Sequence, residues 1–146
     1  MVYILLGDGF EEMEAIAPCD ILRRGDVQVQ FAGVGQRQVT GSHGIVVTAD
    51  CLVDEIRLDE TEMLVLPGGL GGVKSMLAST TAMQLVREAY DRGLWVAAIC
   101  AAPTILAKLG ILNGKKAVCY PGMESACVGG QMTQESEMCI RDRACC

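Results

Sequence analysis

Three short apolar runs constrain the fold of this chain most, because each ends in small residues and a helical pattern follows. The runs are Val2–Leu6, Met63–Leu66 and Leu94–Ile99. Continuous apolar runs of this length are typical of strands buried on both faces of a parallel sheet. Strands that alternate with helices predict an α/β protein with a doubly wound, mostly parallel sheet sandwiched by helices. The functional groups of such sheets gather at the carboxyl ends of the strands.

The segments between these runs predict the rest of the sheet and its helices. Apolar spacing indicates helices over Glu11–Arg24 and Thr81–Arg92, and alternation indicates a strand over Val27–Ala32. Pro18 should kink the first helix, because proline lacks an N–H group. Further patterns predict a hairpin edge at Val39–Thr40, a strand over Ile45–Val47, a helix over Ala102–Leu109 and a strand over Lys116–Cys119.

The C-terminal residues differ in character from the rest of the chain. Residues 131–146 show neither a helical nor a strand period, and they end in Arg-Asp-Arg-Ala-Cys-Cys. We therefore expect one domain over residues 1–130, followed by a non-native or disordered tail over residues 131–146. The fold is then incomplete at its C-terminus.

Charge and cysteine usage exclude several classes of partner. Lysine and arginine total 12 against 18 aspartates and glutamates, a net charge of −6, so neither nucleic acid nor a membrane surface is an expected partner. The eight cysteines come with no secretory signal, and no apolar run approaches the ~20 residues that span a bilayer. We expect a cytoplasmic protein with free thiols. Its single histidine, His43, lies in a predicted loop and is expected to be solvated.

Cys100 is the strongest candidate for chemistry. It lies between the third apolar run and the small residues Ala101 and Ala102, with Pro103 suited to the first turn of a helix. Unpaired amides at a helix N-terminus favour a thiolate and can stabilise an oxyanion, so a lowered thiol pKa is expected. The alternative is a small buried hydrophobic residue, which is the usual fate of a free cysteine. We assign that structural role to the other cysteines considered: Cys19, Cys51, Cys119 and Cys127.

Three glutamates and a glycine pair lie at the other strand ends. Glu11 and Glu12 fall in the first turn of a helix, where compensation of the helix dipole accounts for them. Glu14 can instead face the sheet edge, and a protonated Glu14 could donate a hydrogen bond to the sulfur of Cys100. The glycines of Leu66–Gly69 allow the backbone to approach a ligand closely. No Cys-x-x-Cys or His–Cys pair has ligand spacing, so we expect neither a metal nor a cofactor.

Three motifs in this order, Gly9–Glu14, Leu66–Gly69 and Ala97–Pro103, closely resemble the DJ-1/PfpI superfamily, which is class I glutamine amidotransferase-like. Its branch of Parkinson-disease proteins and deglycases matches best. The resemblance covers Val2 to Gly130 and implies a flavodoxin-like sandwich, a homodimer and an elbow cysteine that oxidises readily to a sulfinic acid. Superfamily members continue with a strand, a Ser-Arg-Gly-Pro-Gly-type loop and a closing helix, which residues 131–146 lack. We expect one face of the sheet to be exposed as a result.

The resemblance also implies the site and its activity. Cys100 matches the reactive cysteine, Glu14 its partner acid, and the backbone amides of Gly69 and Ala101 the pair that binds an oxyanion. Gly68 and Tyr120 line the pocket, and Tyr120 replaces a histidine found in some members, which argues against a Cys-His dyad. The implied activity is that of a cofactor-free enzyme acting on α-oxoaldehydes such as methylglyoxal (glyoxalase III type), or on their early glycation adducts. The alternative is a non-enzymatic redox sensor or chaperone that works through the sulfinic acid of Cys100.

Overall fold

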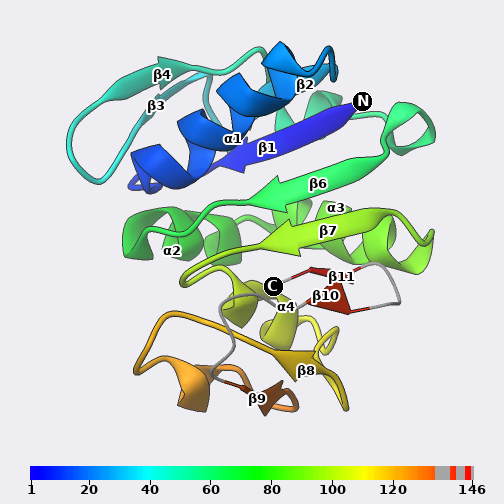
Figure 1. Cartoon of the computed structure of the whole chain (residues 1–146). Helices are drawn as coiled ribbons and strands as arrows, with labels where there is room; N and C mark the ends of the chain where they lie inside the picture. The colour runs from blue at the N-terminus through cyan, green and yellow to red at the C-terminus, as the bar shows by residue number, and fades with distance from the viewer. Residues whose placement is uncertain (134–138, 141–143, 146) are drawn as a thin grey trace.

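A computed structural model of the chain describes residues 1–133, 139–140 and 144–145. Its main sheet has seven strands in the order β10-β11-β7-β6-β1-β2-β5 (Figure 1), parallel from β11 to β5 and antiparallel at β10. The elements in chain order are β1 (Val2–Leu6), α1 (Glu12–Arg24), β2 (Val29–Gly33), β3 (Gln38–Thr40), β4 (Val46–Thr48), β5 (Cys51–Leu52), η1 (Val53–Glu55), η2 (Leu58–Glu60), β6 (Met63–Leu66), α2 (Leu70–Ala78), α3 (Thr80–Asp91), β7 (Trp95–Ala98), α4 (Pro103–Lys108), β8 (Lys116–Ala117), η3 (Glu124–Ala126), β9 (Gln131–Met132), β10 (Cys139–Ile140) and β11 (Ala144–Cys145).

The central strand β1 shows how the sheet divides the core. Tyr3 and Leu5 join the larger cluster, which α2, α3 and α4 cover, whereas Val2, Ile4 and Leu6 join the cluster beneath α1. Successive side chains of a strand point to opposite faces, so helices lie on both faces of the sheet. The predicted doubly wound α/β architecture is confirmed.

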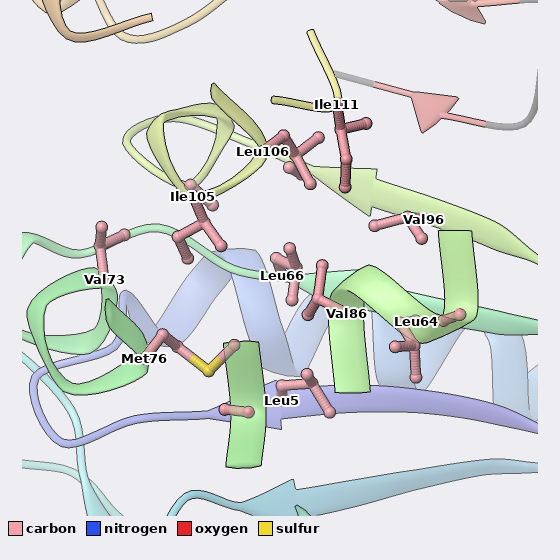
Figure 2. Packing of buried hydrophobic residues seen from close by; sticks show 14 of the residues in the cluster. Leu5, Leu64, Leu66, Val73, Met76, Val86, Val96, Ile105, Leu106 and Ile111 are labelled. Atoms are coloured by element: carbon pink, nitrogen blue, oxygen red, sulfur yellow. The ribbon is translucent and has the colours of Figure 1, made fainter. Parts of the chain in front are cut away.

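The larger cluster joins β6 and β7 to the helices on their face (Figure 2). Leu64 and Val96 are fully buried, and they share this cluster with Val86 of α3 and with Ile105 and Leu106 of α4. Burial of such side chains stabilises a fold by about 25 cal/mol per Å² of apolar surface removed from water. This packing places the carboxyl ends of β1, β6 and β7 side by side, as the sequence predicts.

Helix α2 was not predicted from the sequence. Its first turn holds Gly71 and Gly72, and glycine is a poor helix former. The glycines are required because the loop after β1 approaches the helix. A Cβ on Gly71 would lie 2.9 Å from the Cα of Gly9, and one on Gly72 would lie 2.8 Å from the Cα of Phe10.

Other differences from the predicted elements have local causes. The strand predicted from Val27 begins at Val29, because the N–H of Val27 donates to the carbonyl of Leu22 and closes the end of α1. Helix α1 continues through Pro18 as one element from Glu12 to Arg24.

The C-terminal strands also depart from expectation. Strand β8 pairs with β9 in a separate two-stranded sheet and not with the main sheet (Figure 1). Residues 131–146 were expected to carry no regular structure, yet β9, β10 and β11 lie within them. Ala144 of β11 pairs with Val96, so this segment extends the main sheet beyond β7. Residues 134–138, 141–143 and 146 lie outside the described part of the chain.

The face of β7 opposite the larger cluster is partly uncovered in the described part of the chain. Trp95 is 40% exposed and Ile99, just beyond the strand, is 50% exposed, whereas Val96 and Ala98 between them are buried. No helix among the described residues is long and apolar enough to cross a membrane.

Candidate active site

Cys100 lies in a strained turn between β7 and α4. Its φ angle is +60°, a value that a residue with a Cβ rarely adopts. Two backbone hydrogen bonds stabilise the turn: the N–H of Ile99 donates to the carbonyl of Leu66 at 3.2 Å, and the N–H of Tyr120 donates to the carbonyl of Cys100 at 2.7 Å. The thiol is partly exposed. Strain of this kind persists where the surroundings hold it, and it directs the side chain out of the strand.

Glu14 reaches the cysteine from the first turns of α1. The carboxylate of Glu11 caps this helix by accepting from the N–H of Glu14 at 2.9 Å. The Oε2 atom of Glu14 accepts from the N–H of Gly68 at 2.7 Å, and its carboxylate is also the hydrogen-bond partner of the Cys100 thiol. The structure thus brings Cys100, Glu14 and Gly68 together from three separate strand ends.

Two further amides complete the surroundings of the sulfur. The backbone N–H groups of Gly69 and Ala101 both donate to the sulfur of Cys100. Gly69 has a φ of +83° at the N-cap of α2, and Ala101 follows the strained turn directly. Donors placed in this way can also bind an oxygen that carries negative charge near the sulfur.

The electrostatics of the thiol correct one prediction from the sequence. The pKa of Cys100 is raised, because burial, the charge of Glu14 and the hydrogen bond to Glu14 all oppose the thiolate. The amides of Gly69 and Ala101 lower it but do not outweigh these causes. A lowered pKa was expected from the helix N-terminus, but burial and the charge of Glu14 oppose the thiolate more strongly.

Gly68 occupies a position that accepts no side chain. A Cβ there would lie 2.6 Å from Glu14 Oε2 and 2.7 Å from the Cβ of Cys100. Tyr120 meets the turn through its backbone N–H, while the residue as a whole is 57% exposed. The residues predicted to surround the pocket are therefore neighbours of Cys100.

A second polar cluster beside the site was not predicted. Glu12 is only 5% exposed. Its Oε1 accepts from the N–H of His43 at 2.7 Å, and its Oε2 lies 3.0 Å from His43 Nδ1 and 3.1 Å from the hydroxyl of Ser42, which donates to it. Glu12 therefore holds the loop between β3 and β4 against α1. Glu12 does more than compensate the helix dipole, and His43 is not simply solvated.

These contacts shift the pKa of Glu12 and that of His43. Burial alone would raise the pKa of Glu12, but the hydrogen bonds from His43 and Ser42 lower it to about 2. The hydrogen bond and charge of Glu12 raise the pKa of His43. No local sequence pattern signals this pair, because its partners lie 31 residues apart.

Glu11, Glu12 and His43 are also a possible cation-binding group within the described part of the chain, with donor atoms within 4.8 Å of one another. Glu12 already bonds to His43 and Ser42, while Glu11 caps α1. We therefore assign these residues to structure.

Comparison with known proteins shows that the chain is similar to members of one family. The model of the DJ-1/PfpI family matches residues 1–145. The chain is 36% identical to the protein dj-1beta of Drosophila melanogaster over 140 residues, which cover 95% of this chain and 75% of the fly protein. It is 35% identical to a protein of Pyrococcus abyssi named a deglycase, over 84% of this chain and 74% of that protein.

The fold of the chain is also similar to solved structures from this family. The crystal structure of Drosophila melanogaster DJ-1beta superposes with a TM-score of 0.91 at 34% identity, covering 99% of this chain and 78% of that one. A DJ-1 superfamily protein of Salmonella typhimurium superposes with a TM-score of 0.92 at 29% identity, with the same coverage.

The Glu14→Gln variant should lower the pH at which Cys100 becomes reactive. Glutamine keeps the size of the side chain but removes the charge that opposes the thiolate. Alkylation of Cys100 by iodoacetamide, followed across pH by peptide mass spectrometry, should show a midpoint below that of the wild type. Glu11→Gln is the matched control, because it removes a charge from the same end of α1 without touching the thiol. An unchanged or higher midpoint for Glu14→Gln would contradict the assignment.

The pair of Glu12 and His43 should make stability depend on pH. A raised histidine pKa contributes stability that is present below its ordinary value of 6.5 and is lost as pH rises through the folded value. The lowered pKa of Glu12 contributes above its ordinary value of 4.5, and that contribution is lost as pH falls toward about 2. The Tm difference between wild type and His43→Gln should thus be larger at about pH 5.5 than at about pH 8.5.

The control for this measurement is Gln38→Ala, an exposed change on β3 that alters no titratable group. Its Tm difference from the wild type should be the same at both pH values. If the His43→Gln difference is equally insensitive to pH, the ion pair does not form in solution.

Proposed function

Because this chain belongs to the DJ-1/PfpI family, we propose that it is a cofactor-independent cysteine enzyme that acts on α-oxoaldehydes such as methylglyoxal, or on their early glycation adducts. One observation carries the proposal: the Cys100 thiol hydrogen-bonds to Glu14 while two amides donate to its sulfur. A nucleophile, a proton carrier and an oxyanion site are what addition to an aldehyde requires. Relatives named deglycases support the substrate class.

In the first step, the sulfur of Cys100 attacks the aldehyde carbon. The thiol proton passes to Glu14, a C–S bond forms, and the carbonyl electrons move onto the oxygen. The N–H groups of Gly69 and Ala101 stabilise that oxygen, and the proton then moves from Glu14 to it. The product of this step is a hemithioacetal. Transfer of the proton to Glu14 also removes the charge repulsion that raises the pKa of the thiol.

The second step converts the hemithioacetal into product. Glu14 takes the proton from the carbon that bears the sulfur and returns a proton to the neighbouring carbon, while the hydroxyl proton passes to the oxygen of that neighbouring carbon, which gives a thioester of Cys100. Water hydrolyses this thioester, releasing lactate and restoring the thiol. Lactate equals methylglyoxal plus one water, so the sequence needs no oxidant or reductant.

The position of the histidine supports a mechanism without a Cys-His dyad. His43, the single histidine of the chain, has its Nδ1 bonded to Glu12. The residue beside the turn of Cys100 is Tyr120. A peptidase mechanism of the Cys-His type is therefore not proposed.

A non-enzymatic redox sensor or chaperone is the second candidate. The hydrogen bond between Glu14 and Cys100 favours it as well, because a protonated Glu14 could donate to a sulfinate oxygen of oxidised Cys100. The two candidates differ in whether the protein turns over a substrate.

We also propose that the chain forms a homodimer. Exposed apolar side chains lie on α1, at Met13, Ile16 and Ile21, and on the β3–β4 hairpin, at Ile45 and Val46. The hairpin is joined to the start of α1 through His43 and Glu12. Exposed apolar groups on two elements that are joined in this way support an interaction surface there.

Turnover should depend on Cys100 and Glu14. The wild type should convert methylglyoxal to lactate, Cys100→Ala should abolish the conversion, and Glu14→Gln should lower kcat by roughly 10²–10⁴-fold. Cys51→Ala is the matched control, since it removes another partly exposed thiol and should leave turnover unchanged. Lactate is measured enzymatically. Absence of turnover together with clean formation of Cys100 sulfinate in mild peroxide would favour the sensor instead.

The dimer should depend on its apolar surface. Light scattering should give the mass of two chains for the wild type and of one chain for Val46→Asp, because a carboxylate resists burial in an interface. Val128→Asp is the control, since Val128 is 73% exposed in the loop before β9 and should not affect assembly. A monomeric wild type, or a Val46→Asp variant that remains dimeric, would exclude this surface.

A further inference from the structure

Cys119 and Cys127 lie together in the loop between β8 and β9, although sequence reasoning assigned both to structural roles. Cys119 follows β8 by two residues, and Cys127 directly follows η3. Their side chains are hydrogen-bond partners. Cys127 is 2% exposed within the larger core cluster, whereas Cys119 packs against that cluster and is partly exposed. One thiol is therefore buried, and its partner is open to reagents.

The backbone between β8 and β9 forms a compact loop. A series of turns folds the segment back on itself: the N–H of Met123 donates to Tyr120 at 3.0 Å, and the N–H of Cys127 donates to Glu124 at 3.1 Å. The pairing of Ala117 in β8 with Met132 in β9 closes the base of the loop. These turns fold the segment that carries both cysteines into a loop that is closed at its base.

We propose that Cys119 and Cys127 are a redox-active dithiol that closes to an intramolecular disulfide when a small-molecule disulfide oxidises the protein. The sulfur of Cys119 attacks one sulfur of the reagent, and one reagent thiol leaves. The sulfur of Cys127 then attacks the sulfur of Cys119, so that the second reagent thiol leaves. Two protein thiols are oxidised and one reagent disulfide is reduced to two thiols, with the protons passing to the leaving thiolates.

Exposure and bonding determine which thiol reacts first. Cys119 is the accessible one, and its Sγ hydrogen-bonds to the carbonyl of Tyr120 at 3.4 Å. The pKa of the Cys119 thiol is raised, because burial outweighs the hydrogen bond with Cys127, so its exposure and not its acidity makes Cys119 the first thiol to react. Cys127, buried and adjacent, is positioned as the resolving thiol.

The disulfide would affect the segment that supports Cys100. Tyr120 lies next to Cys119, and its N–H donates to the carbonyl of Cys100 at 2.7 Å. A cross-link across the loop restricts the opening motions that break this bond. The dithiol would therefore couple oxidation to the rigidity of the turn that holds Cys100. This inference does not depend on the proposed enzymatic activity.

Peptide mapping tests the proposal directly. The full chain is incubated with oxidised glutathione, blocked with an alkylating agent and cut with trypsin and a glutamate-specific protease. Cleavage after Lys116, Glu124 and Glu135 places Cys119 and Cys127 in separate peptides, each with one cysteine. We expect these peptides to be disulfide-linked in most wild-type molecules. In the linked protein, hydrogen exchange of the Tyr120 amide should be slower than in the reduced protein.

Two variants complete the experiment. Cys119→Ser should abolish the link, and it tests the proposal even if a change at the buried Cys127 prevents folding. Cys51→Ser removes a different partly exposed thiol and should retain the link. The proposal is overturned if wild-type Cys119 carries only glutathione, or if both thiols stay reduced.

Discussion

The hydrogen bond from the N–H of Gly68 to Glu14 is the interaction on which the rest of the site depends. This bond joins α1 to the loop after β6. The carbonyl of Gly68 also accepts a hydrogen bond from the N–H of Glu11 at 3.1 Å. A glycine is required because any Cβ would overlap Glu14 and Cys100. The parallel pairing of β1, β6 and β7 brings the three chain segments to this point, so the fold and the site have one common constraint.

The close approach that assembles the site also sets its electrostatics. Two amides favour a thiolate, but partial burial and a carboxylate at hydrogen-bond distance oppose it more strongly. The resting thiol is thus protonated more firmly than a free cysteine, and its activation requires a proton acceptor. After burial, Glu14 is the main cause of the raised pKa, and it is also the group able to accept the proton.

Much of the fold was predictable because its signals are local. Strands β1 and β6 occupy the predicted residues, since continuous apolar runs mark buried parallel strands. Helix α2 was not predictable, because its first-turn glycines serve contacts with a loop far away in the sequence. The short strands of residues 131–145 lack a periodic pattern, and β11 forms by pairing with an existing edge at β7.

The sequence by itself determined the α/β class and the turn that carries Cys100. It also offered Glu14 as a candidate partner of Cys100, whereas the amide pair of Gly69 and Ala101 was expected only from the resemblance of three motifs to the superfamily. Only the tertiary structure decided the direction of the Cys100 pKa, the pairing of Glu12 with His43 and the meeting of Cys119 with Cys127. These depend on burial and on distances between side chains that are separate in the sequence. No local pattern encodes such distances before the chain is folded.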